Sequence, residues 1–358
     1  MRLLFFIDSL GSGGAQRQLV NIATSLKKRG YIVSFLTYYK SDFYKKILDE
    51  YEIPISVIEW RNYIDRLFKC RGFIRNGCYD VVISFLETPS FISEIAGLPF
   101  RKWKLIIGER SAAPRILNTV KGRLLRFCHL QADYVVSNSY YNQTLIRKAN
   151  PFLSPTKCKT IYNLYDTNLL SPSNFSYREN TNEFRLIVVA SHQKLKNLHT
   201  LADAICCLSD EDKKRLKIHW YGEKKTTHYQ TSLKHISDLN VQENFSFFDP
   251  TNDIYAKMAE ADAVGLFSIY EGLPNTLCEA MCLGKVIIGS DVSDNKLLIR
   301  IPELICDPSS PQSIAASFSY LLKLTKKEKE TIEVSNREFA LKHFSEDIVI
   351  EKYMELFV

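Results

Sequence analysis

The chain has 358 residues, more than one ordinary hydrophobic core accommodates, so its length predicts two domains. Hydrophobic residues at 46% and charged residues at 24% are typical of a globular protein, and no apolar run reaches the roughly 18 residues that a membrane-spanning helix needs. Nine cysteines lack the spacing of a disulfide framework or a zinc site, which favours buried thiols in a reducing cytosol.

The first half alternates short apolar runs with helical periodicity. Its opening segment, residues 1–8, lacks the length and cleavage site of a secretory signal and is interpreted as the start of a buried strand. Helices are expected at residues 15–28 and 140–148, and a strand end at 160–163. The strands expected before it are residues 3–8, 32–37, 81–85, 105–108 and 134–138.

A polar segment, residues 171–182, is rich in Ser, Asn and Thr and is interpreted as a linker. Beyond it the alternation resumes. Strands are expected at residues 184–190, 216–221, 245–248, 263–267 and 286–290, and helices at 198–208, 229–239, 254–259, 311–322 and within 326–358. Strand–helix alternation on both sides of a linker predicts two doubly wound α/β domains.

A glycine-rich loop, Leu10-Gly-Ser-Gly-Gly-Ala-Gln-Arg17, follows the first expected strand and opens the first helix. Glycines let a backbone approach a phosphate closely, and a helix N-terminus favours an anion. The spacing is not that of the dinucleotide-binding fingerprint, and no acid closes the second strand. Gly13 and Gly14 are therefore candidates for phosphate contact, with a structural turn as the alternative.

A second polar loop, Ser191-His-Gln-Lys-Leu-Lys-Asn197, lies between the first strand and first helix of the second half. Ligands of open α/β sheets bind at the carboxyl ends of the strands, so Lys194 and Lys196 are placed to meet a diphosphate. Lys196 is favoured because it abuts the helix start, whereas Lys194 alone is interpreted as a solvated loop lysine. His192 lies at the same strand end, and His129, on an apolar helix, is interpreted as a core residue.

The most informative stretch, residues 268–284, places Glu271 and Glu279 eight positions apart. Between them Gly272-Leu273-Pro274-Asn275 signals a turn with Pro274 in the first helical turn, and the apolar run that follows stops at Gly284. One acid thus precedes a helix N-terminus, which is a ready anion site, and the other lies on the helix body. A site for phosphate and sugar hydroxyls is what a nucleotide-sugar enzyme needs.

The net charge of +7 is unevenly spread. Eight Lys or Arg residues and one acid stand between 101 and 126, and five Lys or Arg residues and one acid stand between 61 and 75, interleaved with apolar residues. Two interpretations stay open: solvated helix faces, or a basic, partly apolar surface that contacts anionic lipid headgroups. Nucleic acid is not expected, since no helix-turn-helix, zinc-finger or RNA-recognition signature is present.

Taken together, these motifs resemble those of the retaining glycosyltransferases of family 4 (group 1), which have the GT-B fold. The likeness covers nearly the whole chain and rests on Gly13-Gly14-Ala15-Gln16, Ser137-Asn138-Ser139, Ile161-Tyr162-Asn163, Lys196-Asn197, the block from Glu271 to Glu279 with Gly284, and Gly289-Ser290-Asp291. It implies two Rossmann-like domains with a cleft between them. Residues 1–170 would bind the acceptor, residues 171–340 the donor, and a helix within 341–358 would cross back to the first domain.

The resemblance also implies sugar transfer from a nucleotide-diphosphate donor with retained anomeric configuration. Glu271, Lys196 and Gly14 would be catalytic, and Glu279 would hold the ribose hydroxyls. The further donor contacts that it implies are Gly13, Ser191, Lys194, Gly272, Leu273, Pro274, Asn275 and Thr276.

Two positions depart from the family pattern. Ser191 stands where an arginine is usual, and Lys194 is a candidate replacement for that charge. No histidine occupies a strand end in the first domain, so Glu109 and Arg110, at a comparable strand end, are the acceptor-side candidates.

The function expected from the resemblance is hexosyl or N-acetylhexosaminyl transfer to a glycan, in particular a lipid-linked glycan of bacterial surface polysaccharide such as O-antigen or capsule. A UDP-sugar donor is favoured over a GDP-sugar, and no cofactor or metal is expected. The expected location is cytoplasmic, on the inner face of the membrane if the lipid interpretation holds. The alternatives left open are a non-catalytic sugar-nucleotide-binding protein of the same fold and a GT-B epimerase.

Overall fold

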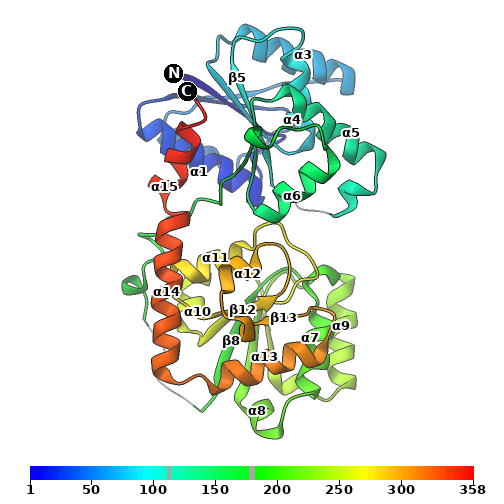
Figure 1. The fold of residues 1–358 in the computed structure, drawn as a ribbon, viewed down its shortest axis with the longest axis vertical. Coiled ribbons are helices and arrows are strands. Elements are labelled where there is room, and N and C mark those ends of the chain that lie inside the picture. The colour runs from blue at the N-terminus through cyan, green and yellow to red at the C-terminus, as the bar shows by residue number, and fades with distance from the viewer. Residues whose placement is uncertain (111–113, 177–181) are drawn as a thin grey trace. The chain divides into compact units, whose positions relative to one another are not determined.

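The computed structural model describes residues 1–110, 114–176 and 182–358 (Figure 1). The chain divides into two compact units, the first comprising Met1–Leu164 with Glu346–Val358 and the second Tyr165–Ser345. The boundary thus falls a few residues before the expected 170, and the chain rejoins the first unit at Glu346. The expected linker, residues 171–182, belongs to the second unit, and its residues 177–181 lie outside the described part of the chain.

The first unit is built on a seven-stranded sheet in the order β3-β2-β1-β4-β5-β6-β7. Each neighbouring pair is parallel, and β1 lies between β2 and β4, with Leu3 opposite Val33 and Val81. The order reverses beside β1, as in doubly wound folds. The strands are β1 (Arg2–Phe6), β2 (Ile32–Thr37), β3 (Ile55–Val57), β4 (Val81–Phe85), β5 (Lys104–Glu109), β6 (Tyr134–Ser137) and β7 (Cys158–Thr160).

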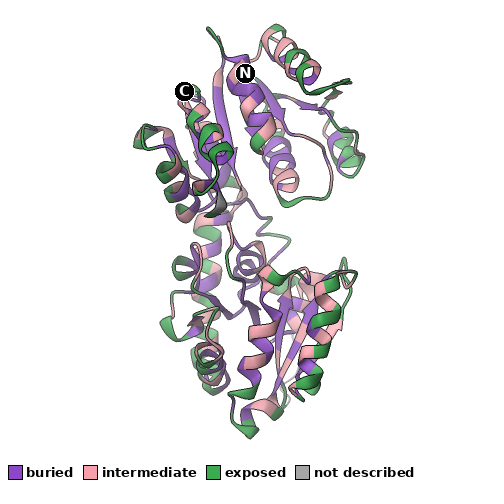
Figure 2. Ribbon diagram, turned by 90° about the vertical axis from the view of Figure 1, so that its right-hand side faces the viewer, coloured by how far each residue is buried: buried purple, intermediate pink, exposed green. Residues whose placement is uncertain are grey.

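Helices cover both faces of this sheet, so its central strands are apolar at successive positions rather than at alternate ones (Figure 2). Leu3 and Phe5 pack on the face that α1 and α15 cover, and Leu4 and Phe6 pack on the face that α3, α4 and α6 cover. The α-helices of the unit are α1 (Gly14–Lys28), α2 (Lys45–Glu50), α3 (Tyr63–Asn76), α4 (Glu87–Ala96), α5 (Val120–Cys128), α6 (Tyr140–Ala149) and α15 (Glu346–Met354).

The second unit repeats the plan with a six-stranded parallel sheet in the order β10-β9-β8-β11-β12-β13. Its strands are β8 (Phe184–Val189), β9 (Leu216–Tyr221), β10 (Phe245–Phe248), β11 (Ala263–Leu266), β12 (Ile287–Ser290) and β13 (Ile305–Cys306). Its α-helices are α7 (Leu198–Cys206), α8 (Asp210–Arg215), α9 (Thr227–Asp238), α10 (Ile254–Glu260), α11 (Asn275–Cys282), α12 (Asn295–Ile299), α13 (Pro311–Lys323) and α14 (Lys326–Phe344).

The helical pattern expected over residues 326–358 forms two helices, α14 and α15. Thr325 and Glu328 make a capping box that starts α14. Ser345 then takes an extended backbone (φ −62°, ψ 152°), which ends α14 and lets α15 begin in the first unit. Within the described ranges, every helix is too short or too polar to cross a bilayer.

Candidate functional site

The predicted strand, turn and helix around the two acids form as β11, a loop and α11. The helix begins at Asn275, so Pro274 immediately precedes it instead of lying in its first turn. Gly284 ends the helix in the left-handed region (φ +64°), and the Lys285 N–H donates to the Ala280 carbonyl at 2.9 Å. The first turn carries no acidic side chain, so its backbone N–H groups are suited to bind an anion.

Lys196 and Glu271, which lie 75 positions apart, form an ion pair in the second unit. The Lys196 Nζ atom is 2.5 Å from Oε1 of Glu271. Lys196 ends a short 3-10 helix, η5 (Lys194–Lys196), and Glu271 belongs to the loop before α11. The Lys196 side chain is 19% exposed and that of Glu271 is 13% exposed, so both are shielded from water but remain accessible at the surface. The structure therefore joins two residues that the sequence selected independently.

Hydrogen bonds hold the loops of this site together. The Ile269 N–H donates to the Leu195 carbonyl at 2.9 Å, which connects the loop after β11 to η5. The Thr276 hydroxyl donates to the Val189 carbonyl at 2.9 Å, which fixes the start of α11 against the end of β8. The Ser293 hydroxyl donates to the Gly272 carbonyl. The loop backbone is thus set in place by the protein itself.

Glu279 lies on the body of α11 and is 7% exposed. The Tyr255 hydroxyl of α10 donates to its Oε1 at 3.5 Å. At the start of the same helix, Oδ1 of Asn275 accepts from the Tyr165 hydroxyl at 2.6 Å. The Asn275, Thr276 and Glu279 side chains thus all have partners within the protein, and the backbone N–H groups at the start of the helix face the loop.

A pocket of about 310 Å³ opens at the carboxyl ends of β8 and β9. Its walls are mainly apolar and include Ser191 and Tyr221. Gly222 is required there because a Cβ at this position would stand 2.0 Å from the Ala190 carbonyl oxygen. The residues that line the pocket are Val189, Ala190, Ser191, Tyr221, Gly222, Glu223, Pro250, Thr251 and Ile254.

Lys194 is exposed and lies beside the histidines of α7 and α9. Burial, followed by the charge of Lys194, lowers the pKa of His228, and Lys194 also contributes to the lowered pKa of His199, for which burial is the main cause. This position agrees with the interpretation of Lys194 as a solvated loop lysine.

His192 is not exposed in a ligand site. Its ring packs against Trp220, Tyr229 and Phe247 at centroid distances of 5.4, 4.5 and 5.4 Å. Burial, with the charge of Lys224 as the next cause, lowers the pKa of His192 to about 4. The imidazole is therefore neutral at physiological pH and part of an aromatic core.

In the first unit, the glycine loop forms the start of α1 as expected. Gly13 occupies the N-cap position with an extended backbone, Gly14 is the first helical residue, and the first turn carries no acid. The Gln16 amide donates to Oδ1 of Asp8 at 3.2 Å, which ties this turn to the end of β1. The backbone N–H groups of the first turn are thus available to an anion.

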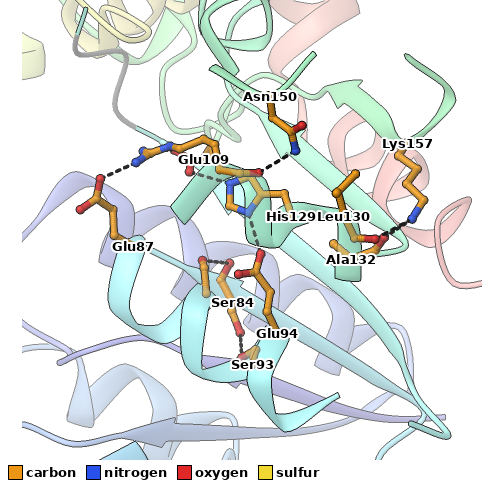
Figure 3. Close-up of polar contacts among 12 residues, drawn as sticks. Ser84, Glu87, Ser93, Glu94, Glu109, His129, Leu130, Ala132, Asn150 and Lys157 are labelled. Carbon is orange, nitrogen blue, oxygen red and sulfur yellow. Dashed lines mark hydrogen bonds and ion pairs between the residues drawn. The ribbon is translucent and has the colours of Figure 1, made fainter. Parts of the chain in front are cut away.

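Glu109 lies in a buried ion network rather than on an accessible surface (Figure 3). Its two carboxylate oxygens lie 3.0 Å from Nε2 of His129 and 2.9 Å from Nη2 of Arg126. His129 also contacts Glu94 at 2.6 Å, and Arg126 contacts Glu87 at 2.6 Å. We therefore do not retain Glu109 as a direct acceptor contact, because both of its oxygens already have partners.

The charges in this network follow from those contacts. Burial opposes ionisation of Glu109, but the hydrogen bond to His129 and the charge of Arg126 outweigh it and lower the pKa of the carboxyl. Burial disfavours the imidazolium, yet hydrogen bonds to Glu109 and Glu94 raise the pKa of His129 to about 9. His129 is a satisfied core residue, as the sequence indicated.

Arg110 also has partners within the first unit. Its guanidinium donates to Oδ1 of Asn163 at 3.1 Å and to the Tyr353 hydroxyl of α15, and it lies 4.1 Å from the Phe85 ring centroid. The Asn138 amide donates to the Arg110 carbonyl at 3.3 Å. Arg110 therefore links α15 to the strand ends. These contacts give Arg110 a structural role that does not involve the acceptor.

Two family models match successive parts of the chain. The model of Glycosyltransferase Family 4 matches residues 12–169, and that of Glycosyl transferases group 1 matches residues 172–337. The chain belongs to the group 1 glycosyltransferases. Between them the two matches span both units, and the second includes Lys196, Glu271 and Glu279.

Two curated relatives of this glycosyltransferase are proteins of Campylobacter jejuni. It is 26% identical over 312 residues to an N-acetylgalactosamine-N,N'-diacetylbacillosaminyl-diphospho-undecaprenol 4-alpha-N-acetylgalactosaminyltransferase, covering 81% of this chain and 80% of that protein. It is 24% identical over 295 residues to a GalNAc-alpha-(1->4)-GalNAc-alpha-(1->3)-diNAcBac-PP-undecaprenol alpha-1,4-N-acetyl-D-galactosaminyltransferase, covering 78% and 77%.

Solved structures confirm the fold of the glycosyltransferase. HepE of Anabaena in complex with UDP superposes with a TM-score of 0.83 at 19% identity, covering 99% of both chains. A glycosyltransferase of Rickettsia africae gives a TM-score of 0.84 at 17% identity, covering 99% of this chain and 97% of that one. Two Rossmann-like parallel-sheet domains are the GT-B fold, as the sequence predicted.

Several residues of the site were not predicted from the sequence. Tyr255 and Ser293 bind the predicted residues Glu279 and Gly272 but lie in segments without a motif. Pro250 and Thr251, in the loop after β10, and Ile254, the first residue of α10, also line the pocket. Their positions could have indicated them, because the loop after β10 and the loop after β12, which contains Ser293, both follow the carboxyl end of a strand. Among the described residues, no cluster of three or more His, Cys, Asp or Glu side chains could hold a metal ion.

Proposed function

We propose that this glycosyltransferase moves a sugar, with retained anomeric configuration, from a UDP-sugar to a lipid-linked glycan in bacterial surface-polysaccharide assembly. One observation carries the donor part of the proposal. A lysine paired with an acid, a helix N-terminus free of acids, a buried carboxylate and an apolar pocket lie at the carboxyl edge of one sheet. These groups match the diphosphate, sugar, ribose and base of a nucleotide sugar.

Each group has a defined task in this proposal. The bond to the leaving diphosphate breaks as negative charge develops on its oxygens, and Lys196 with the α11 backbone N–H groups stabilises that charge. Glu271 holds Lys196 in position and accepts hydrogen bonds from the donor sugar. Glu279 accepts the ribose hydroxyls, and the pocket beside Ser191 and Tyr221 receives the base. Gly13 and Gly14, at the start of α1 in the first unit, stay candidates for phosphate contact through backbone N–H groups.

Retention in this proposal comes from front-side attack, with no protein side chain assigned as a nucleophile. The departing phosphate oxygen takes the proton of the acceptor hydroxyl, which attacks the anomeric carbon from the face that the diphosphate leaves. Positioning and charge stabilisation then supply the catalysis.

The acceptor proposal rests on the relatives. Both Campylobacter jejuni proteins carry names that describe transfer of N-acetylgalactosamine to undecaprenol-linked glycans. We propose an acceptor of the same class, a sugar chain on a lipid diphosphate, and an N-acetylhexosamine or hexose as the transferred sugar.

A lipid-linked acceptor calls for contact with a membrane surface, and α5 fits that role. Val120, Leu124 and Phe127 recur at helical spacing and are 86%, 60% and 49% exposed. Phe152, 76% exposed, lies against Phe127 with ring centroids 6.3 Å apart. The helix carries no acidic residue, and Lys121, Arg123, Arg147 and Lys148 are exposed on and near it. A basic, apolar helix face suits an anionic bilayer.

A thermal-shift series with UDP-, GDP- and ADP-sugars tests the donor assignment, because a ligand that binds only the folded state raises the melting temperature. We expect UDP-sugars to give the largest shift, and NMR of the product to show the donor's anomeric configuration. No shift with any nucleotide sugar would refute the donor site. Binding without transfer to a lipid-linked glycan would favour a non-catalytic sugar-nucleotide-binding protein.

A further inference from the structure

Three aromatic side chains, Tyr39, Trp60 and Tyr63, form a connected group in the first unit, named here the aromatic platform. The ring centroids of Tyr39 and Trp60 are 5.8 Å apart with steeply inclined planes (69°), and those of Trp60 and Tyr63 are 6.0 Å apart with nearly parallel planes (23°). None of the three has a role in the donor site.

The platform lies at the ligand-binding edge of the sheet. Tyr39 follows the carboxyl end of β2, Trp60 follows that of β3, and Tyr63 begins α3. The Tyr39 N–H donates to the Asp8 carbonyl at 2.9 Å, so the platform adjoins the segment that leads from β1 into the glycine loop. Ligands of open α/β sheets bind at this edge.

The rings are held rigidly from below. The Arg66 guanidinium carbon lies 4.9 Å from the Trp60 centroid, 5.0 Å from that of Tyr63 and 4.5 Å from that of Tyr38. Arg66 is only 8% exposed, so these cation–π contacts are largely shielded from water. The Trp60 indole N–H donates to the Tyr38 carbonyl at 3.0 Å. A platform fixed in this way needs little ordering when a ligand binds.

The outer rings are open to solvent and have charged neighbours. Tyr39 is 47% exposed and Tyr63 is 73% exposed. At the rim, Lys40 pairs with Glu59 at 3.3 Å, and both side chains are about four-fifths exposed (79% and 82%). A pyranose ring has an apolar face of C–H groups and an edge of hydroxyls. Flat aromatic rings suit the face, and mixed carboxylate and ammonium groups suit the hydroxyls.

The mixed charge of the rim distinguishes this surface from the lipid-facing helix proposed above. Glu59 and Asp65 stand beside the platform, each paired with a lysine (Lys40 and Lys69), whereas α5 carries basic residues and no acid. Carboxylates repel anionic headgroups, but they accept hydrogen bonds from sugar hydroxyls. The charge pattern therefore favours a neutral sugar at the platform.

We propose that the aromatic platform is a binding subsite for one pyranose ring of the acceptor glycan, with Tyr63 stacking on one face of the sugar and the inclined ring of Tyr39 contacting its edge. The inference rests on the proposed acceptor class, and it assigns to acceptor binding three residues whose side chains lie outside the donor site.

Saturation-transfer NMR with N-acetylgalactosamine- and glucose-containing disaccharides at millimolar concentration tests the proposal. We expect wild-type protein to transfer saturation mainly to the C–H protons of one sugar face. Tyr39→Ala and Tyr63→Ala should each weaken disaccharide binding about threefold to tenfold, the scale of one aromatic contact. Tyr39→Phe and Tyr63→Phe, which keep the ring, should bind nearly as well as wild type.

Two controls separate this proposal from its rivals. The thermal shift with UDP should be the same in all four variants as in wild type, because none of them changes the donor site. If wild-type protein bound a disaccharide but no nucleotide, the donor site would be refuted and the platform proposal would stand. Co-sedimentation with phosphatidylcholine–phosphatidylglycerol vesicles tests the lipid alternative. The platform proposal is overturned if no disaccharide binds wild type, if the Ala variants bind as well as wild type, or if they lose only vesicle binding.

Discussion

The ammonium group of Lys196 lies 2.5 Å from a carboxylate oxygen of Glu271, although the two residues come from loops after different strands. The pair places a cation next to the acid-free N-terminus of α11, where a leaving diphosphate would gain from both.

Replacing Lys196 by Ala should therefore lower kcat by roughly a hundredfold to a thousandfold, the usual loss when one group that stabilises developing charge is removed. The matched control is Lys194→Ala, two positions away and exposed, which should change kcat by less than about threefold. Steady-state kinetics with the UDP-sugar identified by thermal shift measures both variants. Equal losses in the two variants would show that loop charge, and not the Lys196–Glu271 pair, matters.

Glu279→Gln should weaken UDP binding by at least about tenfold, because a carboxyl group with two acceptor oxygens for the ribose hydroxyls becomes an amide that accepts through one oxygen only. Isothermal titration calorimetry with UDP measures the change. Glu330→Gln, an exposed position on α14, is the control and should bind like wild type. If Glu279→Gln stayed within about twofold of wild type, well below 1.4 kcal/mol, our assignment of this carboxylate would be wrong.

Gly222→Ala should destabilise the second unit by roughly 1 to 3 kcal/mol, since a new methyl group must displace backbone. Its Cβ would stand 2.0 Å from the Ala190 carbonyl oxygen, at the wall of the proposed base pocket. The UDP affinity of Gly222→Ala should also fall, because Gly222 lines the proposed base pocket. Gly72→Ala is the matched control: nothing lies within 4 Å of its Cβ inside α3, so it should stabilise by about 0.5 to 1 kcal/mol. Thermal melts distinguish the two, and an unchanged melt for Gly222→Ala would contradict the close packing.

Alkaline pH should destabilise the first unit through His129. The pKa of His129 is raised to about 9, above its ordinary value near 6.5, so the stabilising effect of its charge is complete below about pH 6.5 and is lost as pH rises through 9. The loss is about 3 kcal/mol at most. Melts between pH 7 and pH 10 should show a falling transition that is much flatter in His129→Gln. A parallel slope in both proteins would assign the effect to other groups.

Leu124→Glu should reduce binding to phosphatidylglycerol-containing vesicles by about tenfold or more, since it removes buried apolar area and adds a charge of the wrong sign. Phe100→Glu is a comparable control, because Phe100 is 83% exposed but lies outside α5. Co-sedimentation at low and high salt measures both. Equal losses for the two variants would mean that any exposed apolar residue contributes, and that α5 is not a specific membrane contact.

The fold was largely predictable because its strongest signals are local. Strands β2, β4, β9 and β10 have the bounds expected from the sequence. β4 is buried at every position, as expected of a parallel strand covered on both faces, whereas β9 shows an alternating pattern of burial. The short outer strands β3 and β13 were missed. They have three and two residues and are only partly buried, so their pairing depends on a neighbouring strand and not on their own pattern.

The site shows the same division. The motifs identified Lys196, Glu271 and Glu279, because turn and helix-start residues are local signals. The surroundings of Glu109 and His192 could not be read in the same way. A strand-end position is readable from the sequence, but the direction of the side chain depends on Arg126, His129, Trp220 and Phe247, which come from other segments.

Local chain chemistry thus specified the two α/β units, the glycine-started helix and the acids around α11, since backbone propensity and capping act over a few residues. Partners distant in the chain required folding in three dimensions: the pairing of Lys196 with Glu271, the burial of Glu109 beside His129, and the meeting of Tyr39, Trp60 and Tyr63 over Arg66. Such contacts follow from which strand ends adjoin in the sheet, and no short window of residues contains that information.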